Sequence, residues 1–216
     1  WLSMSLVCSF LPYSIISFLA GIVLVANISS VSLELALILS LIFLMVAIHY
    51  YGFQPGDGYL LLLTPLLFQF KIPYVIPLLV GLSGGLAGIV PVSCGVFVYY
   101  IIQYVKQNAG VLTNDAALDI TQKYVQIIKN MMGNRVMVVM IIAFAAGILV
   151  VYLIRTLSVD YAWHIAIVAG AMTQLMVIFV GDFMFDVSVP MVEMLIGMIA
   201  AMILAAVYNF FVFAVD

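Results

Sequence analysis

The chain has 216 residues, of which 68% are hydrophobic and only 7% are Asp, Glu, Lys or Arg, and its formal net charge is −3. This composition leaves too little polar surface to cover a water-soluble globule, so it predicts an integral membrane protein in contact with the lipid bilayer. Because nucleic-acid binding needs a basic face that neutralises phosphates, DNA and RNA are excluded as expected partners.

The first two predicted membrane helices follow each other closely. An apolar run at about 5–26 is interrupted only by Pro12 and the Tyr13-Ser14 pair, which predicts a kinked span. After a short polar connection, a second span is predicted at 33–52.

The segment 54–104 contains several apolar pieces that are too short to cross a bilayer. Pieces at 59–70 and 92–104 fall short of about 30 Å at 1.5 Å per residue, and a third piece covers 74–90. The residues that interrupt the apolar runs are Pro55, Pro65, Lys71, Pro73, Pro77 and Pro91. This pattern predicts Pro/Gly-broken or re-entrant helices in the centre of the fold, since such backbone must be buried in protein or line a wet cavity.

Four glycines in this segment have helical spacing. Gly81, Gly84, Gly85 and Gly88 form two interleaved GxxxG pairs, which on one helix make a flat stripe for helix packing. The alternative is that the chain unwinds at Gly84 and Gly85 and offers its backbone to a substrate.

The segment at about 114–132 predicts an amphipathic helix. Apolar residues such as Ala117, Ile120 and Tyr124 recur at helical spacing, and polar residues occupy the opposite face. Such a helix either lies in the membrane interface or packs against a partner.

The positive charges predict the orientation of the chain. The loop 106–135 contains Lys106, Lys123, Lys129 and Arg135, against Arg155 alone at the far end of the next span. The positive-inside rule therefore places this loop in the cytoplasm, with the chain in a cell membrane.

Three spans are predicted after this loop. The first, 136–154, is bracketed by Arg135 and Arg155, whose long side chains are expected to reach opposite membrane surfaces. Spans at 161–180 and 189–213 follow, separated by a turn at 181–188.

Polar residues in and near the last two spans are the candidate substrate or ion ligands. Glu193, Asp182 and Gln174 are the main candidates, together with Gly84 and Gly85. In the alternative interpretation, Asp182 and Asp186 lie in a solvated turn and Glu193 lies at headgroup depth.

No catalytic or metal-binding motif accompanies these candidates. There is no HExxH, no CxxC and no convincing Ser-His-Asp order, and Cys8 and Cys94 lie singly in apolar stretches. We therefore expect no cofactor and no bound metal, and the sequence favours a protein without enzyme activity but does not decide the question.

Together these features predict an all-α polytopic membrane protein with six to eight membrane segments in a single transmembrane domain, 1–216. The leading functional hypothesis is a permease-like transport component for a small solute or ion. A scaffold that docks a partner through the helix at 114–132 is the alternative, and an integral membrane enzyme is the third hypothesis. A partner subunit or a homo-oligomer is the expected protein partner.

Overall fold

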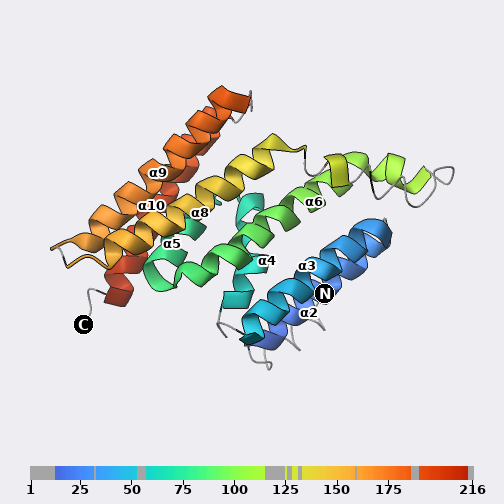
Figure 1. The fold of residues 1–216 in the computed structure, drawn as a ribbon, viewed down its shortest axis with the longest axis horizontal. Coiled ribbons are helices and arrows are strands. Elements are labelled where there is room, and N and C mark those ends of the chain that lie inside the picture. The colour runs from blue at the N-terminus through green and yellow to red at the C-terminus, as the bar shows by residue number, and fades with distance from the viewer. Residues whose placement is uncertain are drawn as a thin grey trace.

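The computed structural model describes residues 13–31, 33–52, 57–114, 125, 128–130, 133–158, 160–185 and 190–213, and the regular elements within them are helices. In chain order these are α2 (Tyr13–Ser29), α3 (Leu33–Gly52), η1 (Asp57–Tyr59), α4 (Leu60–Gln69), α5 (Val75–Ser83), η2 (Leu86–Gly88), α6 (Ile89–Asn114), α8 (Arg135–Arg155), α9 (Ala162–Phe185) and α10 (Met191–Phe213) (Figure 1).

Four helices in the described part of the chain are long and apolar enough to cross a membrane. They cover Leu86–Asn108, Arg135–Arg155, Ala162–Phe185 and Met191–Val212. α9 also exposes a row of large apolar side chains, including Met172, Met176, Phe179 and Phe183. Such a face is suited to contact lipid, in agreement with an α-helical membrane protein.

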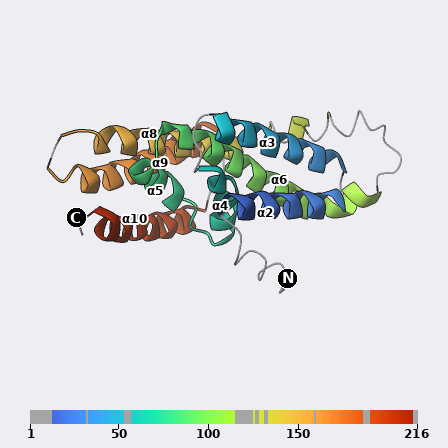
Figure 2. The same cartoon turned by 90° about the horizontal axis from the view of Figure 1, so that it is seen from below.

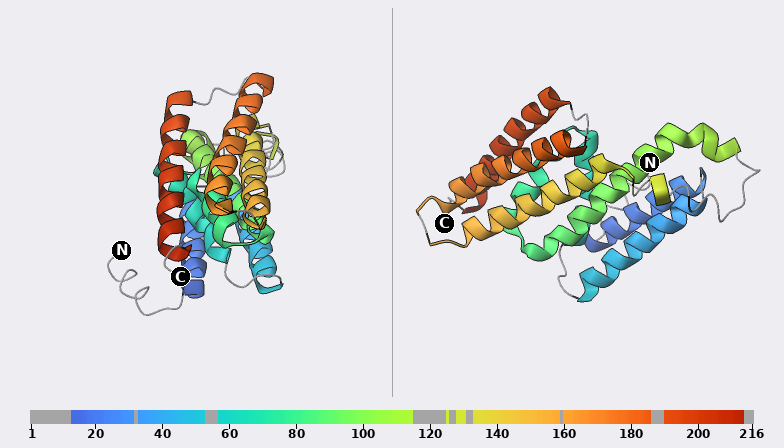
Figure 3. Two further views of the ribbon diagram at one scale, coloured as in Figure 1. Left: turned by 90° about the vertical axis from the view of Figure 1, so that its left-hand side faces the viewer. Right: turned by 45° about the horizontal axis from the view of Figure 1, so that its top comes forward.

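The helices form an elongated bundle that consists of two groups of helices. The hairpin of α2 and α3 forms one group, α5, α8, α9 and α10 form the other, and α4 and α6 lie between the two groups (Figure 2). The axes of α6, α8 and α9 are nearly parallel in two views (Figures 1 and 3). α8 packs along α9, while α6 contacts α3, α4 and α8 and so connects the two groups.

Two arginines mark the two ends of the antiparallel pair α8 and α9. At one end Arg135 Nη1 donates to the carbonyl oxygen of Phe185, the last residue of α9, at 3.3 Å. At the other end the Arg155 guanidinium lies 5.3 Å from the ring centroid of Trp163, in the first turn of α9. We refer to these as the Arg135 end and the Arg155 end of the bundle.

Several predicted boundaries agree closely with the helices. α3 coincides with the predicted span 33–52, and α8 differs from the predicted 136–154 by one residue at each end. α8 begins where it does because the Asn134 side chain accepts a hydrogen bond from the Met137 amide at 3.2 Å, a regular N-cap.

Two predictions differ from the structure. The piece 92–104, predicted to be too short to cross a bilayer, belongs to α6, which runs from Ile89 to Asn114 and contains a candidate span. Pro91 lies in the first turn of α6 and does not separate two helices, because a proline at that place loses no helical hydrogen bond. The predicted turn at 181–188 is wrong in its first half, since α9 continues to Phe185 and Asp182 is helical. The apolar residues 183–185 allow this extension, because no proline occurs before Pro190.

Some predicted features lie outside the described residues. They include the chain before Tyr13, Asp186, and nearly all of the predicted amphipathic helix at 114–132. The side chain of Cys94, on α6, is partly buried, whereas Cys8 falls outside the described chain.

Candidate functional site

α4 runs beside α6 and approaches it closely at a proline. Pro65 lies inside α4 and cannot donate a hydrogen bond to the carbonyl oxygen of Leu61, four residues earlier. Gly95 of α6 lies opposite this place: a Cβ added there would be 3.1 Å from the Leu61 oxygen and 2.6 Å from Thr64 Cβ. Only a glycine therefore allows α6 to pack this tightly on α4.

α4 ends in a Schellman motif that reverses the chain. The Ile72 amide donates to the Leu67 carbonyl and the Lys71 amide to the Phe68 carbonyl, both at 3.1 Å. Lys71 has a φ of 61°, the left-handed conformation that this motif requires after a helix. Pro73 follows and cannot continue the helix, so the chain turns into α5.

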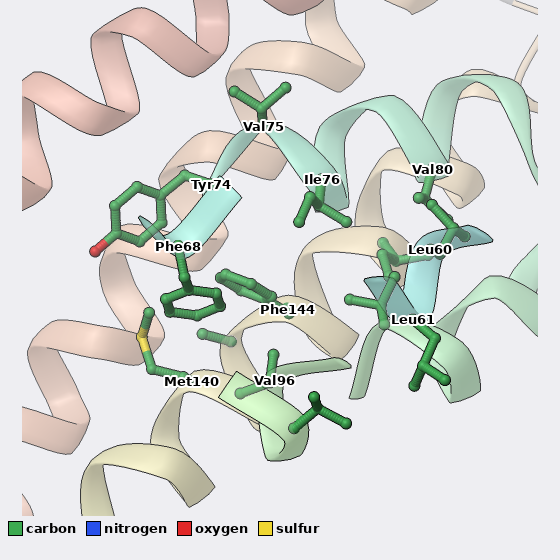
Figure 4. Packing of buried hydrophobic residues seen from close by; sticks show 14 of the residues in the cluster. Leu60, Leu61, Phe68, Tyr74, Val75, Ile76, Val80, Val96, Met140 and Phe144 are labelled. Atoms are coloured by element: carbon green, nitrogen blue, oxygen red, sulfur yellow. The ribbon is translucent and has the colours of Figure 1, made fainter. Parts of the chain in front are cut away.

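The resulting α4–α5 hairpin reaches the middle of the bundle. Phe68 of α4 stacks on Tyr99 of α6 at 4.4 Å and lies 5.7 Å from Phe144 of α8, and Tyr74 lies 6.2 Å from Phe144. Figure 4 shows Phe68, Tyr74 and Phe144 in one buried cluster. At 1.5 Å per residue, Phe144 is about 14 Å along α8 from Arg135, so the turn lies near half the height of α8.

The turn of this hairpin carries an ion pair with the start of α10. Lys71 Nζ lies 3.0 Å from Glu193 Oε1, and the two side chains are 72% and 54% exposed. α10 approaches closely at Gly197, where an added Cβ would lie 3.1 Å from the Lys71 carbonyl oxygen and 3.0 Å from the Tyr74 ring. Glu193 therefore has a basic partner, which comes from a part of the chain 122 residues away.

Gln174 is buried between α8 and α9. Its exposure is 0%, and neither its Nε2 nor its Oε1 has a hydrogen-bond partner among the described residues. The side chain packs on Gly147 of α8, where an added Cβ would lie 2.8 Å from Gln174 Cγ. An uncompensated buried amide is costly in an apolar interior, which makes this position unusual in the bundle.

The four glycines of 81–88 do not share one helix. α5 ends at Ser83, and Gly84 and Gly85 are extended, with φ of −98° and −116°, before η2 and α6 begin. Gly81 packs against Val151 of α8, whose Cβ would be 2.5 Å from an added Cβ. The packing role of this segment thus belongs to Gly81 in α5 and not to a continuous stripe.

Arg155 occupies the C-terminal end of α5. Its Nη1 donates to the carbonyl oxygens of Gly81, Leu82 and Gly84. The guanidinium also lies 5.7 Å from the Tyr152 ring centroid, in addition to its contact with Trp163. Arg155, which was predicted to extend toward a membrane surface, thus contacts the end of α5 at this end of the bundle. The sequence contains no local signal for it, because the carbonyls are about 70 residues away.

The candidate residues occupy separate places along the bundle. Glu193 lies beside the hairpin turn, Gln174 lies between α8 and α9, and Gly84 and Gly85 lie at the Arg155 end. Asp182 is half-buried on α9. Within the described residues, no three His, Cys, Asp or Glu side chains cluster closely enough to hold a metal ion.

Comparisons with known proteins give no further assignment. The chain matches no protein-family model, no curated protein and no solved structure.

Proposed function

We propose that this chain is a permease-like membrane component that transports a small solute or an ion. The observation that carries the proposal is the α4–α5 hairpin, whose turn at 70–74 packs near the middle of α8. Two helices of 10 and 9 residues are too short to cross a bilayer separately, and a hairpin of this length enters and leaves on the same side.

Irregular backbone in the middle of the bundle supports this proposal. The hairpin turn lies about halfway along α8, where Phe68 and Tyr74 contact Phe144. Inside a membrane, non-helical backbone needs to be surrounded by protein or to line a water-filled cavity, and transporters place such segments at their substrate sites. We propose that α2, α3 and the hairpin join the four long helices as membrane segments, in line with the predicted six to eight segments.

The charge distribution supports the proposed orientation. Arg135 lies at the same end as the exit of α9, and Lys106 lies near the end of α6 that leads to the same loop. Arg155 lies at the opposite end. This distribution favours a cytoplasmic location of the loop 106–135 in a cell membrane.

Cysteine accessibility tests the hairpin in a reconstituted bilayer. In a chain with Cys8 and Cys94 replaced by alanine, we expect Ile72→Cys to react with a charged, membrane-impermeant methanethiosulfonate, because a transport path brings water to the turn. Met176→Cys is the matched control: it is exposed on α9 between Gln174 and Gly181, which pack on Gly147 and Val139, so it lies near the level of Phe144, where lipid should shield it from the reagent. If neither cysteine reacts, no aqueous path reaches the turn and the proposal fails.

The scaffold hypothesis remains the second candidate. Within the predicted amphipathic segment, Val125 and Ile128 are 61% and 47% exposed, so apolar side chains are available to a partner or to the membrane interface. Proteoliposomes that pass neither protons, potassium nor glycerol faster than empty vesicles would favour this function over transport.

A further inference from the structure

The contacts of Arg155 are those of a specifically bound guanidinium ion. Three backbone oxygens, those of Gly81, Leu82 and Gly84, accept hydrogen bonds from one end of the side chain. The rings of Tyr152 and Trp163 lie within cation–π distance of its Cζ, at 5.7 and 5.3 Å. We call these three oxygens and two rings the carbonyl cradle.

The carbonyl cradle attracts a cation without any carboxylate. The last turn of a helix has carbonyl oxygens that no helical amide uses, and the helix dipole makes this end negative. The three oxygens belong to the last turn of α5 and the extended residue after it. In the described part of the chain no carboxylate pairs with Arg155, so dipoles and ring faces alone hold its charge.

The chemistry of the cradle selects a planar cation. All three oxygens accept from one nitrogen, Nη1, and an ammonium with three N–H donors could satisfy them as well. The two rings distinguish the ions, because a guanidinium is planar and stacks on aromatic faces, whereas an ammonium is a compact and strongly hydrated point charge.

We propose that the carbonyl cradle is a recognition site for guanidinium cations, which Arg155 occupies as a tethered ligand. Its side chain acts as a latch that joins the end of α8 and the start of α9 to the connection between α5 and α6. In a variant without this side chain, the cradle should accept a free guanidinium in its place. This inference does not depend on a transport function.

Chemical rescue tests the proposal on the purified full chain. We expect Arg155→Ala to lower the midpoint of thermal unfolding by about 5 °C, because charged hydrogen bonds and a ring contact are lost. Millimolar guanidinium should restore most of this loss with saturation. Urea and tetramethylammonium should not restore it. Urea has a similar planar shape without the charge, and tetramethylammonium has the charge without N–H donors. Equal effects of the three additives, or an unchanged midpoint in Arg155→Ala, would overturn the proposal.

A second variant keeps the proposal testable if Arg155→Ala does not fold. Arg155→Lys preserves the positive charge but lacks the planar guanidinium that stacks on the two rings, so its unfolding midpoint should fall clearly below that of the wild type. A midpoint equal to the wild type would show that any cation suffices, against the proposal. Arg135→Ala is the matched control: Arg135 is exposed and donates to one carbonyl, so guanidinium should not stabilise that variant.

Discussion

The amide of Gln174 is buried on Gly147 with both polar atoms unpaired among the described residues. A buried polar group without a partner costs about 1–3 kcal/mol, while an apolar side chain of the same shape carries no such penalty. We expect Gln174→Met to increase the free energy of unfolding by roughly 1 kcal/mol, measured by thermal or denaturant unfolding in detergent.

Thr64→Val is the control for this prediction, because Thr64 is also fully buried but its hydroxyl donates to the Leu60 carbonyl at 2.6 Å. That variant should give no increase in stability. A loss of stability in Gln174→Met would mean that the amide has a partner in the bilayer, such as a bound solute.

Glu193 is the second candidate ligand at the residue scale, and in the structure it forms an ion pair with Lys71. Because both side chains are largely exposed, the pair itself should contribute less than about 1 kcal/mol to stability. Glu193→Gln preserves the shape and removes the charge, so we expect it to abolish ion-coupled flux in proteoliposomes while leaving the unfolding midpoint nearly unchanged.

Asp160→Asn is the matched carboxylate control for Glu193→Gln, since Asp160 is exposed in the turn between α8 and α9 and is not a candidate ligand, so the flux should be unchanged. Unaltered flux in Glu193→Gln would limit Glu193 to the ion pair and remove it from the candidate ligands.

At the scale of elements, glycines allow the helices to approach each other. Val151 of α8 lies between Gly81 of α5 and Gly170 of α9, so one side chain fills the space left by two missing Cβ atoms. The three helices meet there, close to the Arg155 end. An alanine at either glycine would place its Cβ in direct overlap with Val151.

We therefore expect Gly170→Ala to lower the free energy of unfolding by about 1–3 kcal/mol through overpacking. In the double variant with Val151→Ala, most of the lost free energy of unfolding should be recovered, because the smaller side chain leaves room for the added Cβ. The two single variants and the double variant form a thermodynamic cycle that is measured by denaturant unfolding. Additive effects of the two changes would contradict the direct contact.

At the scale of the whole molecule, α8 separates two loops that we expect on opposite sides of the membrane. The loop 106–135 precedes α8 and the turn with Asp160 follows it, and α8 is 21 residues long with high apolar content. The two should therefore lie on opposite sides of the membrane. We expect Gln122→Cys to be protected from an impermeant thiol reagent in intact cells and Asp160→Cys to be labelled.

Labelling in permeabilised cells provides the control, because both cysteines should then react. Strong labelling of Gln122→Cys from outside would reverse the orientation. Equal labelling of both cysteines in intact cells would show that α8 does not cross the membrane.

The helices with long apolar runs were predictable, and the reason lies in local sequence. The run of α8 between Arg135 and Arg155 and the run of α3 contain no proline, so apolar length alone indicates their boundaries. Prediction was weaker where prolines are frequent, because a proline is compatible with the first turn of a helix, as in α6, and also with an interior position, as Pro65 in α4 shows.

The sequence by itself determined that the protein is built from apolar helices, and it determined many of their boundaries. Both depend on the length of an apolar run and on the residues that interrupt it, within about 20 residues of the chain. Only the tertiary structure decided which distant groups meet: Lys71 with Glu193, Gln174 with Gly147, and Arg155 with the end of α5. These contacts depend on how helices pack and on which carbonyls a helix end leaves unused. No periodicity in the sequence encodes a distance between such places, so their chemistry emerges only when the bundle is assembled.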